Sequence, residues 1–426
     1  MNAPLPWLAP YRATPVVGEV LVPGSKSQTN RALILAALGD GPSRLTRPLK
    51  SRDTMLMADA LTALGATIDR DGIIWTITPA GLDHTGTVSI DCGLAGTVMR
   101  FVPAVAALTS ADVTFDGDEH ARVRPMSTTI SALRDLGVTI EDGGRGALPF
   151  VVQGSGRVAG GSLEIDASSS SQFVSALLLS GARFDKGLEL RHVGAALPSM
   201  PHIEMTVNEL RKRGVEVDDS RPNRWTVSPG PIAALNDEIE PDLSNAGVFI
   251  AGALVTGGSI RIRNWPEQTD QAGDAWRSIV EAFGATAVRD GADLVFAADG
   301  PLRGVELDLH DVGELTPVVA AMAALAQGPS RLTGVAHLRG HETDRLAALV
   351  TEINRLGGDA EELEDGIAVR PRPLHAETFR TYDDHRMAHA AVVLGLRVEG
   401  LLVENVVTTV KTYPNFAPVW ERLMTP

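Results

Sequence analysis

Residues 22–38, with the sequence VPGSKSQTNRALILAAL, combine hydroxyl groups with positive charges at the start of a predicted helix. Lys26, Ser27 and Arg31 fall at or inside its first turn, where backbone N–H groups lack intrahelical partners. Hydroxyls, a cation and a helix N-terminus together favour binding of a phosphate or a carboxylate. The stretch is not a Walker A loop, because no glycine directly precedes the lysine. Taken alone, it is equally compatible with an ordinary solvated helix start capped by serine.

The composition limits the class of protein. A chain of 426 residues is too long for one ordinary core, so we expect two domains. A formal net charge of −15 argues against nucleic-acid binding. The single cysteine, Cys92, leaves no disulfide framework and suits a reducing cytoplasm. Residues 1–15 lack the pattern of a signal peptide, and the apolar run 246–256 is too short for a bilayer. We therefore expect a cytoplasmic protein with no membrane association.

One pattern repeats six times along the chain: a helix, a strand, a helix and two short strands, with the last copy ending after its second helix. Glycines that end the second helices recur at intervals of about 70 to 77 residues. We expect two domains of three copies each, residues 23–238 and residues 1–22 with 239–426. The segment Arg12–Leu21 would complete the C-terminal domain as a strand, and crossovers near Val22 and Asp237 would form a hinge.

The starts of the predicted helices carry the polar residues. The first helix of each copy begins in a polar segment, and a second polar set precedes the second helix of several copies. Together the two sets supply seven cations and two carboxylates: Lys26, Arg31, Arg100, Arg124, Arg345, Arg386, Lys411, Glu314 and Glu342. Because symmetry would bring the helix starts together, this pattern predicts a site for two anionic substrates and one acid/base step.

Six motifs carry a resemblance to a known family: PGSKSQTNRAL, LAGTVMR, SSSSQF, HETDRL, DDHRMA and KTYPNF. In order and spacing they resemble the 5-enolpyruvylshikimate-3-phosphate synthase family, over essentially the whole chain. The resemblance implies an α/β fold, a two-domain inside-out α/β barrel of six βαβαββ repeats. It also implies transfer of the enolpyruvyl group of phosphoenolpyruvate to the 5-hydroxyl of shikimate 3-phosphate, in the route to chorismate and aromatic amino acids. A monomer without metal or organic cofactor is expected.

The resemblance also implies roles for single residues. The shikimate 3-phosphate contacts would be Lys26, Ser27, Arg31, Ser170, Ser171, Gln172, Ser199, Glu314 and His341. The phosphoenolpyruvate contacts would be Lys26, Gly96, Arg124, Gln172, Arg345, Arg386 and Lys411. Glu314 would accept a proton from the hydroxyl, while Glu342 and Lys26 would handle the C3 proton and the departing phosphate. Gly96 would let the backbone approach the ligand closely.

The chain departs from the family pattern at Leu94, often Asn, at His341, often Lys, and at His202, often Tyr. Sensitivity to glyphosate, the family's inhibitor, is also implied, with Leu94 and Phe101 bearing on its strength.

Two other interpretations stay open. UDP-N-acetylglucosamine enolpyruvyl transferase shares the fold but usually carries a reactive cysteine on a flexible loop and Lys-Asn near its start, whereas this chain has Lys26-Ser27. A non-catalytic, anion-binding repeat protein would not need Glu314 and Glu342 among the cations.

Overall fold

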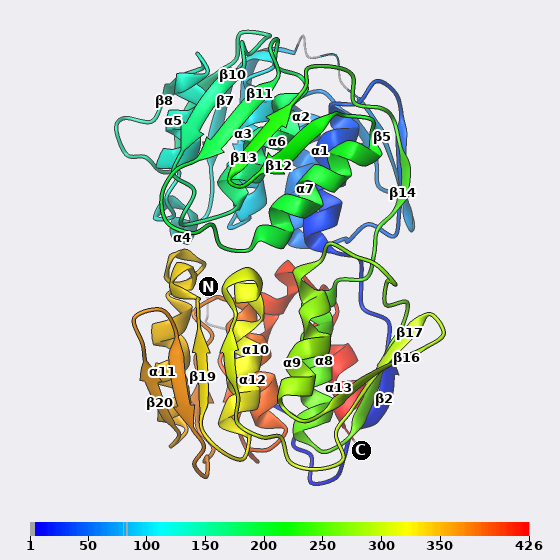
Figure 1. The fold of residues 1–426 in the computed structure, drawn as a ribbon, viewed down its shortest axis with the longest axis vertical. Helices are drawn as coiled ribbons and strands as arrows, with labels where there is room; N and C mark the ends of the chain where they lie inside the picture. Colours follow the sequence, from blue (N-terminus) through cyan, green and yellow to red (C-terminus); the bar gives the residue numbers. More distant parts are fainter. Residues whose placement is uncertain (1–4, 80, 82–83, 426) are drawn as a thin grey trace. The chain divides into compact units, whose positions relative to one another are not determined.

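The computed structural model describes residues 5–79, 81 and 84–425 (Figure 1). The chain forms two compact units. Residues 24–240 make up one, called here the continuous unit, and the chain up to Pro23 together with residues from Pro241 onward makes up the other, called the split unit. Among the residues described, no helix combines the length and the apolar character needed to cross a bilayer.

Three four-stranded sheets of identical topology build the continuous unit. In each, the first two strands are parallel and the remaining neighbours are antiparallel. In sheet order the strands are β14 (Asn236–Glu238), β3 (Ser43–Thr46), β5 (Ile74–Thr78) and β4 (Thr67–Asp69); β6 (Thr85–Asp91), β7 (Ser110–Asp116), β9 (Phe150–Gln153) and β8 (Thr139–Glu141); β10 (Gly161–Ile165), β11 (Leu188–His192), β13 (Arg224–Val227) and β12 (Val217–Arg221).

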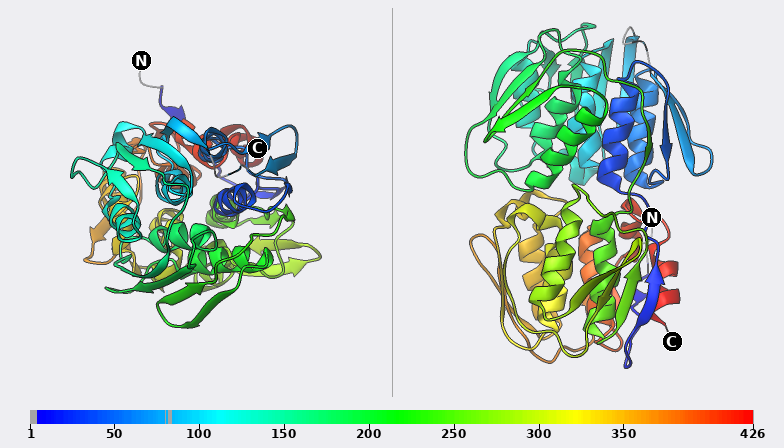
Figure 2. Two further views of the ribbon diagram at one scale, coloured as in Figure 1. Left: turned by 90° about the horizontal axis from the view of Figure 1, so that it is seen from above. Right: turned by 45° about the vertical axis from the view of Figure 1, so that its right-hand side comes forward.

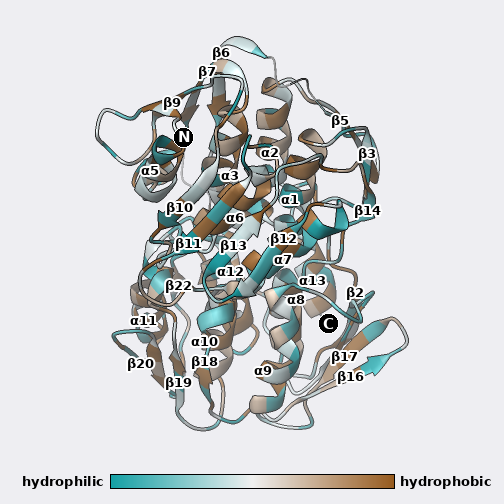
Figure 3. Ribbon diagram, turned by 45° about the horizontal axis from the view of Figure 1, so that its top comes forward, coloured by the Kyte–Doolittle hydropathy of each residue, from teal (hydrophilic) through white to brown (hydrophobic). Residues whose placement is uncertain are grey.

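Two kinds of helix pack against these sheets (Figure 2). Inner helices are buried on all faces beyond their first residues, because they carry apolar or small side chains all round. These are α1 (Lys26–Ala37), α3 (Gly96–Ala106) and α6 (Gln172–Gly181). Outer helices bury one stripe and expose the opposite face: α2 (Arg52–Ala63), α5 (Ser127–Asp135) and α7 (Met200–Lys212), with the short α4 (Glu119–Arg122) preceding α5. The apolar residues of α3 and α6 can be followed in Figure 3.

The split unit repeats this plan, with one shortened sheet. Its sheets, in strand order, are β2 (Val17–Val20), β15 (Ser259–Ile262), β17 (Asp293–Ala297) and β16 (Thr286–Asp290); β18 (Glu306–Asp308), β19 (Ser330–Thr333), β21 (Ile367–Arg370) and β20 (Asp359–Glu362); β22 (Thr378–Phe379), β23 (Leu402–Val403) and β1 (Trp7–Leu8). Its α-helices are α8 (Leu243–Val255), α9 (Trp276–Ala282), α10 (Thr316–Ala324), α11 (Arg345–Arg355), α12 (His385–Gly395) and α13 (Phe416–Met424). Its 3₁₀ helices are η1 (Ala272–Ala275), η2 (His310–Leu315), η3 (Ala336–Gly340) and η4 (Val406–Lys411).

The N-terminal segment differs from the expectation of one strand over Arg12–Leu21. Only Val17–Val20 form a strand there, and β2 pairs in parallel with β15 in the sheet of the fourth repeat. The shortened sheet of the sixth repeat is closed by β1, which lies outside the expected segment and pairs antiparallel with β23. The chain before the first helix therefore completes two sheets of the split unit.

The two crossovers exchange strands between repeats. β2 precedes α1 along the chain but pairs with β15, while β14 precedes α8 but pairs with β3. Each unit thus takes its first parallel strand from the segment that leads into the other unit's first helix. The five helix-ending glycines all adopt the predicted left-handed backbone, Gly65, Gly137, Gly214, Gly284 and Gly357.

Candidate functional site

In the continuous unit, the N-terminal ends of the three inner helices meet. Asn30 Nδ2 on α1 donates to Thr97 Oγ1 on α3 at 2.7 Å, and Arg100 Nη1 on α3 donates to Gln172 Oε1 on α6 at 2.8 Å. Each helix start contributes positive electrostatic potential, so three starts side by side favour an anion. The sequence prediction that polar helix starts gather is confirmed within this unit.

Gly96, Arg124 and Gln172 form the closest group at these helix starts. A Cβ at position 96 would lie 3.1 Å from both Arg124 Nη2 and Gln172 Oε1, so only glycine leaves both side chains where they are. Arg124 is 6% exposed and donates from Nη1 to the Leu94 carbonyl at 3.3 Å, while its buried Nε has no hydrogen-bond partner among the described residues. These two side chains therefore lie close to Gly96, while the expected approach of a ligand to its backbone stays a prediction.

Arg31 is committed to protein contacts. It donates from Nε to Thr206 Oγ1 at 2.7 Å, from Nη1 to the Ser27 carbonyl at 3.1 Å and from Nη2 to the His202 carbonyl at 2.9 Å. Burial lowers the pKa of Arg31 to about 10, and Glu209 acts in the opposite direction. Arg31 ties α1 to α7 and orients the backbone at Ser27. His202, expected just before α7, lies inside its first turn.

The serines and Lys26 line the same helix starts. Helix α1 begins at Lys26, with Ser25 as its cap. Lys26 Nζ lies 3.5 Å from Asp53 Oδ2, and both side chains are largely buried. Ser170 Oγ accepts from Gln172 N at 3.3 Å, with Ser171 as the N-cap residue of α6. Ser199, the N-cap residue of α7, has a strained φ of 56°, which commonly marks a functional position.

In the split unit, Arg345 is the centre of a charged network. This buried residue donates to Asp384 from Nε at 2.8 Å and from Nη2 at 3.2 Å, and to Glu342 Oε2 from Nη2 at 2.9 Å. Lys411 Nζ donates to the other oxygen of Glu342. Burial alone would lower the pKa of Arg345, but Asp384 and Glu342 outweigh it and raise the pKa. Lys411, expected before a helix, is the last residue of η4.

Arg386 and Glu314 lie beside this network. Arg386 Nη1 donates to the Ser244 carbonyl at 3.1 Å, and Ser244 Oγ donates to Glu314 Oε1 at 3.4 Å, so Ser244 joins the two. Burial lowers the pKa of Arg386, while Asp242 and Glu314 act in the opposite direction. Asp242 caps α8 by accepting from Asn245 N at 2.9 Å.

Two histidines adjoin the carboxylates. His341 Nδ1 lies 3.1 Å from Arg345 Nη1, and because arginine can only donate, Nδ1 must accept. His337 packs against Gly313, next to Glu314: a Cβ at position 313 would come within 2.4 Å of His337 Nε2. Burial lowers the pKa of His337 to about 4, with His310 adding to the effect, so this imidazole is neutral at pH 7.

The structure therefore gathers the predicted residues into two groups, one in each unit. Sequence reasoning counted Arg100 among the cations of the site but did not predict that it orients Gln172, and it assigned no role to Asp384, which pairs with Arg345 across 39 residues. Arg100 lies in the motif LAGTVMR and Asp384 in the motif DDHRMA, so their place in these motifs could have indicated that they belong to the site. Asn30 stands inside PGSKSQTNRAL, but its bond to Thr97 depends on a contact distant in sequence. The contacts of Ser244 and His337, which lie outside the quoted motifs, are also distant in sequence.

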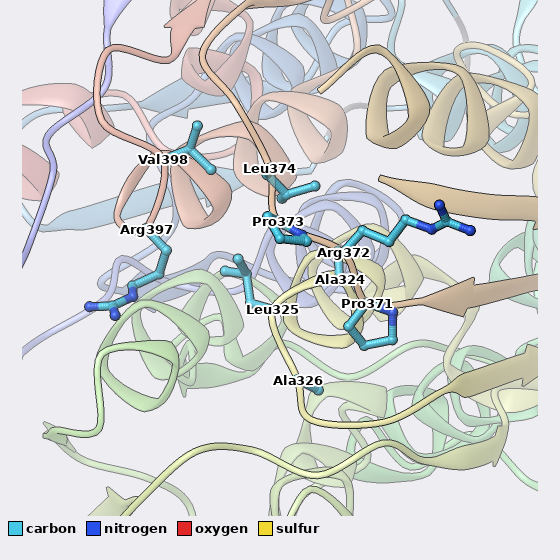
Figure 4. Close-up of a pocket in the computed structure, with 9 residues that line it drawn as sticks. All are labelled: Ala324, Leu325, Ala326, Pro371, Arg372, Pro373, Leu374, Arg397 and Val398. Carbon is cyan, nitrogen blue, oxygen red and sulfur yellow. The ribbon is translucent and has the colours of Figure 1, made fainter. Parts of the chain in front are cut away.

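A surface cavity of about 340 Å³ lies away from these residues in the split unit (Figure 4). It is found at the C-terminal ends of α10 and α12, opposite the helix starts, and none of the predicted site residues lines it. Its lining is Ala324, Leu325, Ala326, Pro371, Arg372, Pro373, Leu374, Arg397 and Val398. In the described part of the chain, no group of three or more His, Cys, Asp or Glu side chains is placed to hold a metal ion.

Six sheets of related topology pack around buried helices, and basic residues lie at the helix starts. Together these features define the class of protein as a two-unit inside-out α/β protein. The chain belongs to the family EPSP synthase (3-phosphoshikimate 1-carboxyvinyltransferase), whose sequence profile matches residues 10–420.

Curated relatives extend over the whole chain. A 3-phosphoshikimate 1-carboxyvinyltransferase of Kocuria rhizophila is 54% identical, covering 98% of this chain and 96% of its own length. The enzyme of that name from Mycobacterium ulcerans is 51% identical, covering 100% of this chain and 99% of its own length. Two structures of EPSP synthase from Acinetobacter baumannii superpose with TM-scores of 0.79 and 0.78 at 22% identity, each covering 98% of both chains. The predicted family and fold class are confirmed.

Proposed function

We propose that this protein transfers the enolpyruvyl group of phosphoenolpyruvate to the 5-hydroxyl of shikimate 3-phosphate and releases phosphate, as part of aromatic amino-acid biosynthesis. The observation that carries the proposal is full-length similarity, at 51% and 54% identity, to relatives named 3-phosphoshikimate 1-carboxyvinyltransferase. The arrangement of cations around two carboxylates suits two anionic substrates and a proton transfer.

In this proposal, the continuous unit supplies cations that are held mainly by neutral oxygens. Arg124 and Gln172, kept apart by Gly96, contact phosphoenolpyruvate, and Lys26 serves both substrates. Shikimate 3-phosphate is held by hydroxyl groups and by the basic start of α1: Ser27, Arg31, Ser170, Ser171 and Ser199. The buried Nε of Arg124 supports this assignment, because an anion would give that nitrogen a partner.

The split unit supplies the acid/base groups and further cations. Arg345, Arg386 and Lys411 contact phosphoenolpyruvate, and His341 contacts shikimate 3-phosphate. Glu314 accepts the proton of the 5-hydroxyl as that oxygen attacks C2 of phosphoenolpyruvate. Glu342 and Lys26 handle the proton gained at C3, which gives a tetrahedral phosphoketal. Loss of a C3 proton and departure of phosphate then complete the transfer.

Several broader expectations belong to the same proposal. The enzyme acts in the cytoplasm as a monomer on small-molecule substrates, without cofactor, nucleic acid or membrane. Residues 23–238 and residues 1–22 with 239–426 are its two domains, with hinge points near Val22 and Asp237. Size-exclusion chromatography with light scattering, with and without both substrates, tests the monomer.

Phosphate release from the purified protein tests the reaction, with shikimate 3-phosphate and phosphoenolpyruvate supplied singly and together in chelator-treated buffer. We expect release only from the mixture. Release when UDP-N-acetylglucosamine replaces shikimate 3-phosphate would move the protein to the sister activity, and silence in every mixture would contradict catalysis.

The role of Glu314 is tested by Glu314→Gln, with Glu306→Gln, on an exposed strand position, as the matched control. We expect a fall in kcat of about 10²-fold or more in Glu314→Gln, since a positioned general base contributes about that much. The control should keep wild-type turnover. Near-normal kcat in Glu314→Gln would remove this residue as the base.

A further inference from the structure

The turn directly before α12 is strained. Tyr382 and Asp383 both have a φ of 53°, and Asp384 N closes the turn by donating to the Thr381 carbonyl at 2.8 Å. Side chains with a Cβ seldom adopt this left-handed backbone, and a bulky side chain such as tyrosine adopts it least readily. Such a backbone persists only where the surrounding structure enforces it.

Two carboxylates hold the turn in place. Glu352 on α11, which is fully buried, accepts from Tyr382 Oη at 2.7 Å and from Arg380 N at 2.9 Å. Glu404 accepts from Thr381 N at 2.9 Å. Three consecutive residues, 380–382, are thus each bonded to a carboxylate, and hydrogen bonds to an ionised acceptor are stronger than neutral ones.

Asp384, at the end of this turn, determines where two arginines lie. As the N-cap of α12 it accepts from Arg386 N at 2.8 Å, and the same carboxylate accepts two bonds from Arg345. Arg345 and Arg386 are two of the three split-unit residues proposed above to contact phosphoenolpyruvate. A change in the turn would therefore move both guanidinium groups together.

We propose that Glu352 and Tyr382 are positioning residues for phosphoenolpyruvate: the hydrogen bond between them holds the strained turn, and the turn sets Asp384, Arg345 and Arg386. This inference rests on the proposed function. Burial and the bond to Glu352 raise the pKa of Tyr382 to about 12, so its hydroxyl remains a donor at neutral and mildly alkaline pH.

The test compares Tyr382→Phe with Tyr11→Phe, an exposed tyrosine in the same unit. We expect Tyr382→Phe to raise the KM for phosphoenolpyruvate about tenfold while kcat changes less than threefold, because a weaker ground-state contact leaves chemistry largely intact. Tyr11→Phe should match wild type. A KM within twofold of wild type in Tyr382→Phe overturns the proposal, including when the melting temperature falls.

A double-mutant cycle identifies the bond itself. Glu352→Gln and Tyr382→Phe should each raise this KM, and the double variant should resemble Glu352→Gln. Both changes alter the bond between Tyr382 and Glu352, and Glu352→Gln also weakens the bonds of Glu352 to Arg380 N and Arg355. Asp383→Gly, which relieves the left-handed strain, should restore part of the affinity lost in Tyr382→Phe. Additive effects together with no rescue would contradict the proposal.

Phosphoenolpyruvate binding is also measured by calorimetry. Absence of turnover in wild type contradicts the proposed function, whereas weakened binding in Tyr382→Phe alone still supports the positioning role. If wild type and Tyr382→Phe bind phosphoenolpyruvate equally well, the positioning role is contradicted.

Discussion

The two groups of site residues hold their arginines in different ways. In the continuous unit, Arg31 and Arg124 donate to hydroxyl and carbonyl oxygens. In the split unit, Arg345 is bonded to the carboxylates of Asp384 and Glu342, and Lys411 to Glu342. In the first group, neither Arg31 nor Arg124 has a carboxylate at hydrogen-bond distance, so their positive charges are not neutralised. In the second group, the carboxylates of Asp384 and Glu342 neutralise much of the positive charge of Arg345 and Lys411.

This difference suggests a division of labour. Buried cations that are held only by neutral oxygens gain strongly when an anion arrives, which suits substrate binding. A network in which Arg345 and Lys411 already have carboxylate partners is rigid without substrate and keeps Glu342 oriented, which suits proton transfer. The pKa shifts of Arg31 and Arg345 follow this difference, since burial lowers the pKa of Arg31 but the carboxylates raise the pKa of Arg345. Arg386 in the split unit, which donates to a carbonyl, resembles Arg31, because burial lowers its pKa.

The largest effect is expected for Arg345→Ala. Removing this side chain leaves the buried carboxylate of Asp384 without its two bonds, and breaking a buried ion pair costs about 3–5 kcal/mol. Urea unfolding should show this loss, and phosphate release should stop. The matched control is Arg370→Ala, which also pairs with two carboxylates, Asp359 and Glu361, but is half exposed and should lose much less stability. Equal losses of unfolding free energy in Arg345→Ala and Arg370→Ala would contradict the special role of the buried network.

Arg124→Ala should separate activity from stability. Its one protein hydrogen bond goes to a neutral carbonyl, so the free energy of unfolding should fall by only about 1 kcal/mol. Turnover should fall at least about 10²-fold, because a charge proposed to contact phosphoenolpyruvate is lost. Arg122→Ala, which removes an exposed arginine paired with Asp116, should retain full activity. Unchanged turnover in Arg124→Ala would take this residue out of the site.

Gly96→Ala probes the continuous unit more finely. The added methyl group would press against Arg124 and Gln172 at 3.1 Å, so we expect the KM for phosphoenolpyruvate to rise about tenfold, equivalent to about 1.4 kcal/mol. Gly230→Ala is the control, because a Cβ there meets nothing within 4 Å. Steady-state kinetics with both variants makes the comparison. An unchanged KM in Gly96→Ala would mean that these side chains do not need their present positions.

The smallest effect concerns the pH dependence of stability in the split unit. The pKa of His337 is lowered to about 4, so the imidazole contributes stability above its ordinary pKa of about 6.5, and that contribution is lost as the pH falls toward 4. Between pH 7.5 and 5.5 the loss from this group is about 1 kcal/mol. His337→Gln should unfold with a shallower pH dependence than wild type, whereas His120→Gln, at an exposed site, should not. Identical pH profiles for wild type and His337→Gln would contradict the buried neutral imidazole.

Much of the fold could be predicted because it depends on local patterns. Helix periodicity and the terminal glycines, such as Gly65 and Gly137, mark six repeats that the sheets reproduce. The sequence predicted that Arg12–Leu21 completes the C-terminal domain, but the partner strands of β2 and β14 could not be predicted, because both are short strands whose partners lie about 200 residues away or more in the sequence.

The site shows the same division. Residue types at helix starts predicted the cations and carboxylates of the site, whereas the role of Gly96 came from the family resemblance and its position against Arg124 was not predicted. The partners that distinguish the two groups were not predictable, since Asp384 reaches Arg345 and Asp53 reaches Lys26 only through tertiary packing. The two left-handed residues before α12, Tyr382 and Asp383, are not glycines. The sequence therefore does not indicate their strained backbone, which is found only in the structure.

Running the reaction in D₂O with shikimate 3-phosphate and unlabelled phosphoenolpyruvate tests the central claim most directly. Addition places a solvent deuteron on C3, and elimination then removes one of three hydrogens from the resulting methyl group. The account predicts an enolpyruvyl ether whose methylene carries deuterium, detected by proton NMR, with one phosphate released for each ether formed. An ether with an undeuterated methylene would contradict the addition–elimination route, and the absence of any ether would contradict the function.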